Sequence, residues 1–229
     1  MILSAHQSGV WPYLGYFDKI DQADLFVYMD CVSFEKNSYT SRNRIRNAQG
    51  WQYLTVPCLK PYGKINEIQI DNTQDWRKKH LKSIKQNYSK AKYFDTYFPA
   101  IENVYMGEDW ELLSDFNYFC LITVLKELGI DTQVVKMSSY DPPFQGTKSD
   151  LILDMCLRTG SSWFIFGKNG KDYAKPVLFN DAGIQIEFQN YVPIEYKQCY
   201  NNFIENLSIL DLLFNMGDQA LEVIRGNNG

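Results

Sequence analysis

A group of polar and aromatic side chains near the start of the chain could form a binding site. The group follows the apolar segment Ile2–Ala5 and continues past Pro12, a residue that favours the first turn of a helix. An imidazole and an amide at the end of a strand could contact a substrate, and the free N–H groups of a helix N-terminus could bind an anion. We therefore predict a substrate site that contains His6, Gln7, Trp11, Tyr13, Gly15 and Tyr16.

His6 and His80 are the two histidines of the chain, and either could be a general base because the pKa of imidazole lies near neutral pH. For each of them, the alternative is a packed and hydrogen-bonded core residue. His6 ends a strand beside a turn, which favours a functional role. His80 lies between Trp76 and Ile84 on the apolar side of a helix, so it belongs to the core or points into a pocket. The sequence leaves open whether the two histidines share one site.

Two basic stretches supply candidate ligands for phosphate. The first contains Lys36, Arg42, Asn43 and Arg44, and the second contains Lys79. Arginine and lysine match the charge of a phosphate or of a nucleotide sugar. A solvated helix face is the alternative explanation for such runs. The net charge of −4 gives no support for binding to nucleic acid.

Two carboxylates are candidates because of their surroundings. Asp30 ends the apolar segment Leu25–Met29, and Asp211 is a single charge within the apolar stretch Leu207–Phe214. A buried carboxylate without a partner is costly, so Asp211 should have one. A structural hydrogen bond and a position at a pocket both remain open. We include both carboxylates among the candidate substrate-binding residues.

Several common catalytic motifs are missing from the sequence. It contains no G-x-G-x-x-G, P-loop or G-x-S-x-G segment, which argues against the dinucleotide, P-loop and serine-hydrolase classes. The five cysteines are scattered and never form a C-x-x-C pair, so we expect reduced thiols, a cytoplasmic protein and no metal site. The cofactor is unknown. The Gly-Lys-Asn-Gly-Lys segment at 167–171 could bind phosphate or form a surface turn.

The elements that would position these residues alternate between apolar strands and amphipathic helices. Residues 2–5, a helix that begins at Pro12 and residues 25–29 form a β-α-β unit. Unbroken apolar strands of this kind are typical of a parallel sheet with both faces covered. We expect a single α/β domain over residues 1–229, with a mostly parallel, Rossmann-like sheet and additional helices.

Four further segments carry weaker signals. Residues 31–50 are polar and should be irregular, and residues 65–70 alternate between apolar and polar types like an edge strand. Residues 207–214 should form an apolar helix, and the final residues 227–229 should fray. No apolar run approaches the ~20 residues that a membrane span needs, so we expect none.

The segment Tyr13-Leu14-Gly15-Tyr16 resembles the His-x-Gly-His motif that class I nucleotidyltransferases carry at the same strand-to-helix junction. The resemblance implies a nucleotidyltransferase-like layout. Tyrosines replace both histidines here, and a neutral phenol cannot stabilise phosphate charge as an imidazolium does. The resemblance therefore bears on the fold rather than on nucleotidyl transfer.

Segments from one end of the chain to the other resemble the WbqC-like family. They are His6-Gln7 with Trp11–Ile20, Phe34–Lys36 with Arg42–Ile45, Leu54–Pro57, Trp76–His80 and Leu207–Gly217. The chain departs at Ser8-Gly9, because family members usually have a Gln-Pro pair at this point. The resemblance implies a bacterial protein, often encoded among polysaccharide or O-antigen genes, and it supplies no settled reaction.

Two functional hypotheses follow. The first is a cytosolic transferase that binds a nucleotide-linked amino sugar and transfers a small group, by acyl or aminoacyl transfer or, more narrowly, by nucleotidyl transfer. His6 or His80 would be the base, and Arg42, Arg44 and Lys79 would hold phosphates.

The second hypothesis is a non-catalytic protein that binds a partner of the polysaccharide-synthesis machinery. The apolar helix around Leu210 and Phe214, together with tyrosines, would form the interface. This hypothesis also leaves a homodimer open.

Overall fold

A central parallel sheet organises the protein, whose computed structural model describes residues 1–226; the end expected to fray, 227–229, lies outside the described residues. The strand order is β7-β2-β1-β8-β9, and every neighbouring pair is parallel. The strands are β1 (Ile2–Gln7), β2 (Leu25–Met29), β7 (Gln133–Lys136), β8 (Trp163–Phe166) and β9 (Gln185–Phe188). This is the order of a Rossmann-like sheet, so the α/β, mostly parallel fold class is confirmed.

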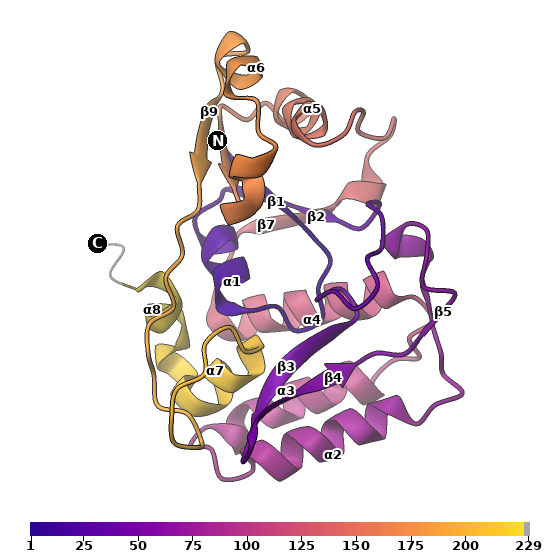
Figure 1. The fold of residues 1–229 in the computed structure, drawn as a ribbon, viewed down its shortest axis with the longest axis vertical. Helices are drawn as coiled ribbons and strands as arrows, with labels where there is room; N and C mark the ends of the chain where they lie inside the picture. Colours follow the sequence, from indigo (N-terminus) through magenta and orange to yellow (C-terminus); the bar gives the residue numbers. More distant parts are fainter. Residues whose placement is uncertain (227–229) are drawn as a thin grey trace.

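Helices cover both faces of the sheet (Figure 1). They are α1 (Leu14–Asp21), α2 (Trp76–Tyr88), α3 (Phe94–Met106), α4 (Leu113–Leu128), α5 (Ser149–Thr159), α6 (Pro176–Asp181), α7 (Ile209–Met216) and α8 (Ala220–Arg225). Short 3-10 turns are η1 (Ile65–Glu67), η2 (Met137–Ser139), η3 (Lys168–Asp172) and η4 (Gly217–Gln219). One face packs on α5 and α6, and the other packs on a larger core that contains α1 to α4, α7 and α8.

The alternation of side chains along the strands produces these two cores. Leu25 and Val27 of β2 pack toward α5, whereas Phe26 and Tyr28 pack toward the larger core. The side chains on both faces of β2 are therefore apolar, so the sequence of this strand is an unbroken apolar run. Helix α4 ends where Gly129 takes a left-handed conformation (φ 69°), the stop that glycine favours.

Two expectations for the middle of the chain are wrong. Residues 31–50 are not irregular throughout, because β3 (Arg42–Asn47) pairs antiparallel with β4 (Gly50–Thr55) as a hairpin outside the central sheet. Buried polar side chains on β3 interrupt the alternation of apolar and polar residues by which a strand is recognised in a sequence. Residues 65–70 do not form an edge strand of the central sheet; η1 is followed by β6 (Gln69–Ile70), which pairs with β5 (Cys58–Leu59).

Helix α7 belongs to the core. Leu210 and Phe214 are fully buried, so the surface that the partner-binding hypothesis needs there is not exposed. Within residues 1–226, no helix combines the length and apolar character of a membrane span.

Candidate functional site

The candidate site lies where the order of the parallel strands reverses. β2 lies on one side of β1 and β8 on the other, at the centre of the sheet. In open parallel α/β sheets, ligands bind in the crevice outside the carboxyl ends of the strands at this reversal. Here the crevice lies between the end of β1, at His6 and Gln7, and the end of β8, which continues into Gly167 and Lys168.

Two adjoining cavities occupy this crevice. The first, of about 590 Å³, we call the tyrosine pocket; Tyr13, Tyr16, Tyr39, Tyr191, Arg44 and Gln189 contribute to its lining. The second, of about 450 Å³, we call the lysine pocket; Lys19, Lys148, Lys168, Met29, Ile152 and Phe166 contribute to its lining. The residues that line both are His6, Gln7, Tyr13, Lys168 and Asn169. The pockets therefore form one cleft in two parts, each of the size of a small-molecule site.

Gly15 allows two of the tyrosines to approach helix α1. A Cβ atom at this position would lie 2.6 Å from the ring of Tyr13 and 2.9 Å from the ring of Tyr191. The carbonyl of Gly15 also accepts a hydrogen bond of 2.7 Å from the amide of Gln189, whose Nε2 donates to Asp18 as well (2.6 Å). The absence of a side chain at Gly15 thus shapes the tyrosine pocket.

His6 lies at the junction of the two pockets. Its ring packs on Tyr16, with 4.7 Å between the ring centroids, and its Nδ1 lies 3.1 Å from the carbonyl of Gln7. A carbonyl only accepts, so Nδ1 carries the proton and Nε2 keeps its lone pair. Burial and the nearby charge of Lys19 lower the pKa of His6 to about 3. The imidazole is therefore neutral at pH 7.

Lys19 is a charged residue of the cleft that is almost completely buried. Its side chain is 1% exposed, and Nζ donates a hydrogen bond of 2.9 Å to the carbonyl of Ala5. Burial lowers the pKa of its amine to about 7. A Cβ atom at position 167 would lie 3.7 Å from Nζ, so Gly167 leaves the space beside the amine open. A helix lysine whose amine is buried against a central strand is typical of a functional group, because burying its charge is costly.

Trp11 and His80, both predicted site residues, belong to a buried hydrogen-bond chain instead. The indole N–H of Trp11 donates to the hydroxyl of Tyr105 (2.8 Å), which lies 3.2 Å from Nδ1 of His80. Nε2 of His80 lies 3.0 Å from the carbonyl of Thr55. Burial lowers the pKa of His80 to about 4, so this imidazole is neutral and satisfied. Neither residue lines the cleft, and His80 does not share a site with His6.

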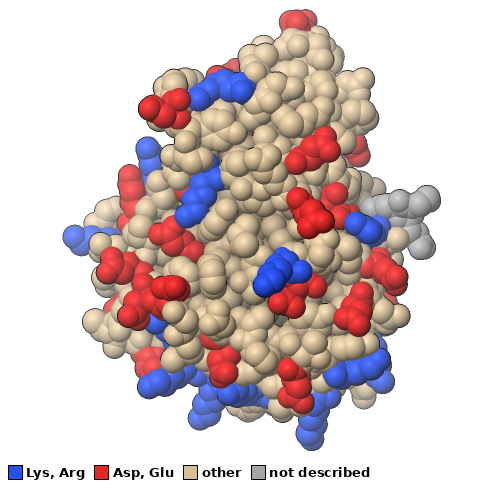
Figure 2. Space-filling model, turned by 180° about the vertical axis from the view of Figure 1, so that it is seen from behind, with Lys and Arg blue, Asp and Glu red and all other residues tan. Residues whose placement is uncertain are grey.

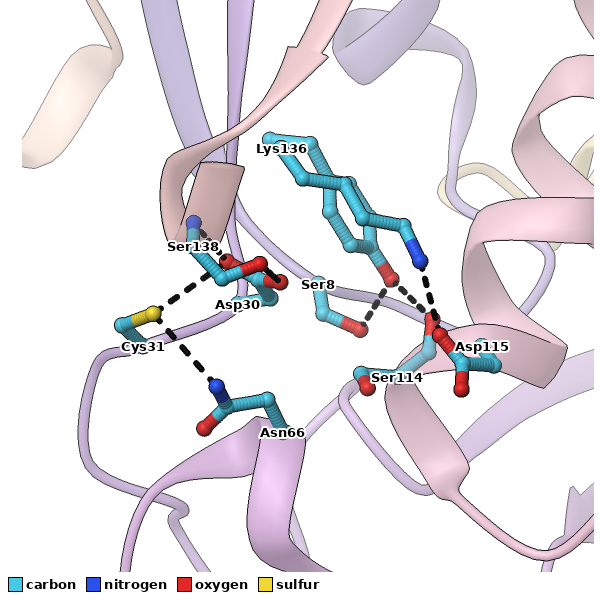
Figure 3. Close-up of polar contacts among 9 residues, drawn as sticks. Ser8, Asp30, Cys31, Asn66, Ser114, Asp115, Lys136 and Ser138 are labelled. Carbon is cyan, nitrogen blue, oxygen red and sulfur yellow. Dashed lines mark hydrogen bonds and ion pairs between the residues drawn. The ribbon is translucent and has the colours of Figure 1, made fainter. Parts of the chain in front are cut away.

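Asp30 has a structural role at the end of β2. Its carboxylate accepts hydrogen bonds from the N–H (3.0 Å) and the hydroxyl (2.6 Å) of Ser138, which join β2 to η2. Figure 3 shows this contact beside the thiol of Cys31, which lies between Asp30 and Asn66. Burial first, and Asp30 next, raise the pKa of Cys31 to about 11, so the thiol stays protonated at neutral pH. Asp30 does not line either pocket.

Asp211 also has structural partners. It is fully buried and accepts hydrogen bonds from the hydroxyls of Tyr88 (2.9 Å) and Tyr196 (2.7 Å). Burial raises the pKa of Asp211 to about 6, and these hydroxyls oppose the rise because they stabilise the carboxylate. The hydrogen-bond partners expected for this carboxylate are thus two tyrosines of the core, neither of which lines the cleft.

The predicted cationic residues separate into two groups. Arg44 and Asn43 of β3 line the tyrosine pocket. Lys36 and Lys79 are exposed, and Arg42 stacks on Tyr53 with its guanidinium carbon 4.2 Å from the ring centroid. None of these three lines the cleft. Figure 2 shows Lys and Arg side chains gathered at the lower end of the molecule, where Figure 1 places α2, so the second basic stretch forms a solvated helix face there.

The cleft contains residues that the sequence analysis did not select. They include Lys19, Tyr39, Lys148, Gln189 and Tyr191. Lys168 also lines the cleft and belongs to the segment 167–171, for which the sequence left open phosphate binding or a surface turn. Gln189 follows the last strand directly, so the carboxyl-end rule that selected His6 could have selected it too. Lys19 occupies an inward position of α1, four residues after Gly15, but a lysine at such a position usually reaches solvent.

The fold and the cleft define a Rossmann-like α/β protein with a two-part cleft at the reversal of strand order. Residues 7–223 match the WbqC-like protein family, and the chain belongs to that family. An uncharacterized protein of Mycobacterium tuberculosis, Rv1507c, is 32% identical over 223 residues, which cover 96% of this chain and 95% of the relative. No solved structure was found to match the chain. Among residues 1–226, no cluster of three or more His, Cys, Asp or Glu is placed to hold a metal ion.

Proposed function

We propose that the protein is a cytoplasmic transferase of surface-polysaccharide biosynthesis that acts on a nucleotide-linked amino sugar, by acyl or aminoacyl transfer. The observation that carries the proposal is the two-part cleft at the reversal of strand order, with His6 at the junction of its two pockets. Two pockets with a shared boundary suit a reaction that joins two substrates, because each substrate has its own binding surface.

The lining of the tyrosine pocket suits a sugar and its phosphates. Tyr13, Tyr16 and Tyr191 offer ring faces, and amides such as Gln189 offer hydrogen bonds that fix orientation. Nε of Arg44 and the hydroxyl of Tyr191 are buried without a hydrogen-bond partner among the described residues. Both residues line the pocket, although these two atoms are themselves covered by protein. Arg44 and Lys168 would contact the phosphates.

His6 would accept a proton in the transfer step. The amino nitrogen of the sugar attacks the acyl carbon of the donor, the donor's leaving group departs, and the nitrogen loses a proton to Nε2 of His6 as the amide forms. In the free protein the pKa of His6 is about 3, which makes it a weak base. An anionic substrate beside Lys19 would raise that pKa, because it offsets the lysine charge that helps to lower it.

Nucleotidyl transfer has less support from the same residues. Burial raises the pKa of both Tyr13 and Tyr16, so their phenols stay neutral where the related motif has histidines. Neutral phenols do not offset the charge of a transferring phosphoryl group. Acyl or aminoacyl transfer to the amino group of the sugar therefore fits the cleft better.

Thermal-shift measurements with a panel of nucleotides and nucleotide-linked amino sugars test the proposal. A bound ligand at ~100 times its dissociation constant adds ~2.7 kcal/mol of stability. We expect a shift for the wild-type protein that is reduced in Arg44→Ala and retained in Arg42→Ala, a matched control two residues away on β3 that does not line the cleft. Equal loss in both variants, or no shift with any nucleotide sugar, would contradict the proposal.

A further inference from the structure

The lysine pocket differs in charge from the protein that surrounds it. Lys19, Lys148 and Lys168 line it together with His6, and among the described residues that line it none is acidic. The whole chain carries a net charge of −4. A cavity with three cations and no carboxylate inside an acidic protein attracts anions.

Lys19 is the buried charge of this pocket. An ammonium group has three N–H donors, and within the described residues Nζ has one hydrogen-bond partner, the carbonyl of Ala5. Lys148 and Lys168 are exposed, so their charges remain in contact with water. The cost of burying the charge of Lys19 would be offset by an anion at the open space beside Gly167.

Apolar side chains form much of the remaining lining, beside the polar groups of Gln7, Tyr13, Asn169 and Tyr173. Met29, Val32, Leu151 and Ile152 contribute aliphatic and thioether side chains, and Phe166 contributes an aromatic ring. Of the three lysines, Lys19 is the buried one, so one negative charge is matched in the buried part of the pocket. A second charge would lie against the apolar side chains or depend on the exposed Lys148 and Lys168. The lining therefore fits an anion with a single charge and an apolar body.

We propose that the lysine pocket binds a small monocarboxylate with a short apolar chain, whose carboxylate contacts Nζ of Lys19 and whose chain packs on Met29 and Ile152. A free carboxylate has no leaving group and is therefore not the acyl donor of the transfer step, so this binding does not rest on the proposed function. Carboxylate binding places a negative charge beside Lys19 and close to His6.

Isothermal titration calorimetry with butyrate tests this inference. Butylamine has a similar apolar chain with a positive charge, and inorganic phosphate is an anion without an apolar chain, so the two controls separate the contributions of charge and of the chain. We expect butyrate to bind better than either of them. Lys19→Met should weaken butyrate binding by about tenfold or more, the effect of losing a hydrogen bond to a charged group. Gly167→Val keeps the lysine and places methyl groups beside Nζ, at a residue whose φ of −68° accepts a side chain, and it should weaken binding similarly.

Lys171→Ala is the matched control, because Lys171 is exposed on the same turn, η3, and lines neither pocket. Its affinity for butyrate should equal that of the wild-type protein. Binding of phosphate in preference to butyrate, or unchanged butyrate affinity in both Lys19→Met and Gly167→Val, would overturn the inference. A protein that binds nucleotide sugars but no butyrate contradicts this inference alone, and the converse result contradicts only the proposed function.

Discussion

Replacing Lys19 with methionine should stabilise the protein at pH 7 and lose that effect as the pH rises. Burial lowers the pKa of Lys19 from 10.5 to about 7 in the folded chain. Between these two values the unfolded chain binds more protons at this residue, so the stability of the wild-type protein rises with pH. At ~1.4 kcal/mol for each pH unit, the buried amine costs about 5 kcal/mol of folding free energy below pH 7.

Methionine removes this cost and keeps an unbranched side chain of similar length. It also leaves the carbonyl of Ala5 without its 2.9 Å hydrogen bond, which costs about 1–3 kcal/mol. The expected net gain at pH 7 is therefore about 2–4 kcal/mol. At pH 10 the wild-type protein should have recovered about 3–4 kcal/mol relative to the variant, because its amine is then neutral in the folded chain.

Urea denaturation of both proteins from pH 6 to pH 10 measures the difference directly. Lys171→Met, at an exposed position, controls for the loss of a lysine and should show no such pH dependence. A difference between Lys19→Met and the wild-type protein that stays constant over this range would refute the reasoning. A less stable variant at pH 7 would refute it too, since the lysine would then have a partner that offsets its charge.

Three further predictions concern the core and the shape of the cleft. His80→Ala should lower the free energy of unfolding by about 2–4 kcal/mol, measured by urea denaturation, because it removes a buried imidazole together with its contacts to the hydroxyl of Tyr105 and the carbonyl of Thr55. It should leave nucleotide-sugar affinity unchanged, and a loss of affinity in a folded variant would show that His80 belongs to the site. Asp211 has a folded pKa of about 6, raised from 3.8, so the folded chain binds more protons in that interval and wild-type stability should fall by about 3 kcal/mol as the pH rises through it. Asp211→Asn should remove this dependence in denaturation curves from pH 4 to pH 7, and an unchanged slope would count against the assignment. Gly15→Ala should cost about 1–3 kcal/mol in thermal or urea unfolding and weaken ligand binding, because its Cβ would lie 2.6 Å from Tyr13 and 2.9 Å from Tyr191; full stability and affinity would show that both rings move freely.

The sequence predicts the centre of the fold because local signals agree there with the tertiary structure. The apolar run at 25–29 and the glycine stop after α4 each have a local cause, whereas the helix expected from Pro12 begins two residues later, at Leu14. The expectation that His6 and Gln7 lie at the end of β1 follows from the same rule. The sequence does not predict strand β3, because Asn43 and Arg46 are buried polar residues with hydrogen-bond partners in distant segments.

The site residues show a similar limit. Trp11 and His80 have polar atoms that could serve a ligand, but Tyr105, remote in sequence from both, satisfies them in the core. Lys19 shows the opposite case, because its sequence context resembles that of a surface lysine. Only the packing of α1 against the ends of β1 and β8 buries its amine. Tertiary partners, rather than residue type or spacing, decide which polar residues are free for chemistry.

A crystal structure of the protein with a bound nucleotide-linked amino sugar tests the central claim most directly. The account predicts that the sugar packs on the rings of Tyr13 and Tyr191, with its phosphates at Arg44 and Lys168 and its amino group within hydrogen-bonding distance of Nε2 of His6. A ligand bound outside the two pockets, or one whose amino group lies away from His6, would contradict it.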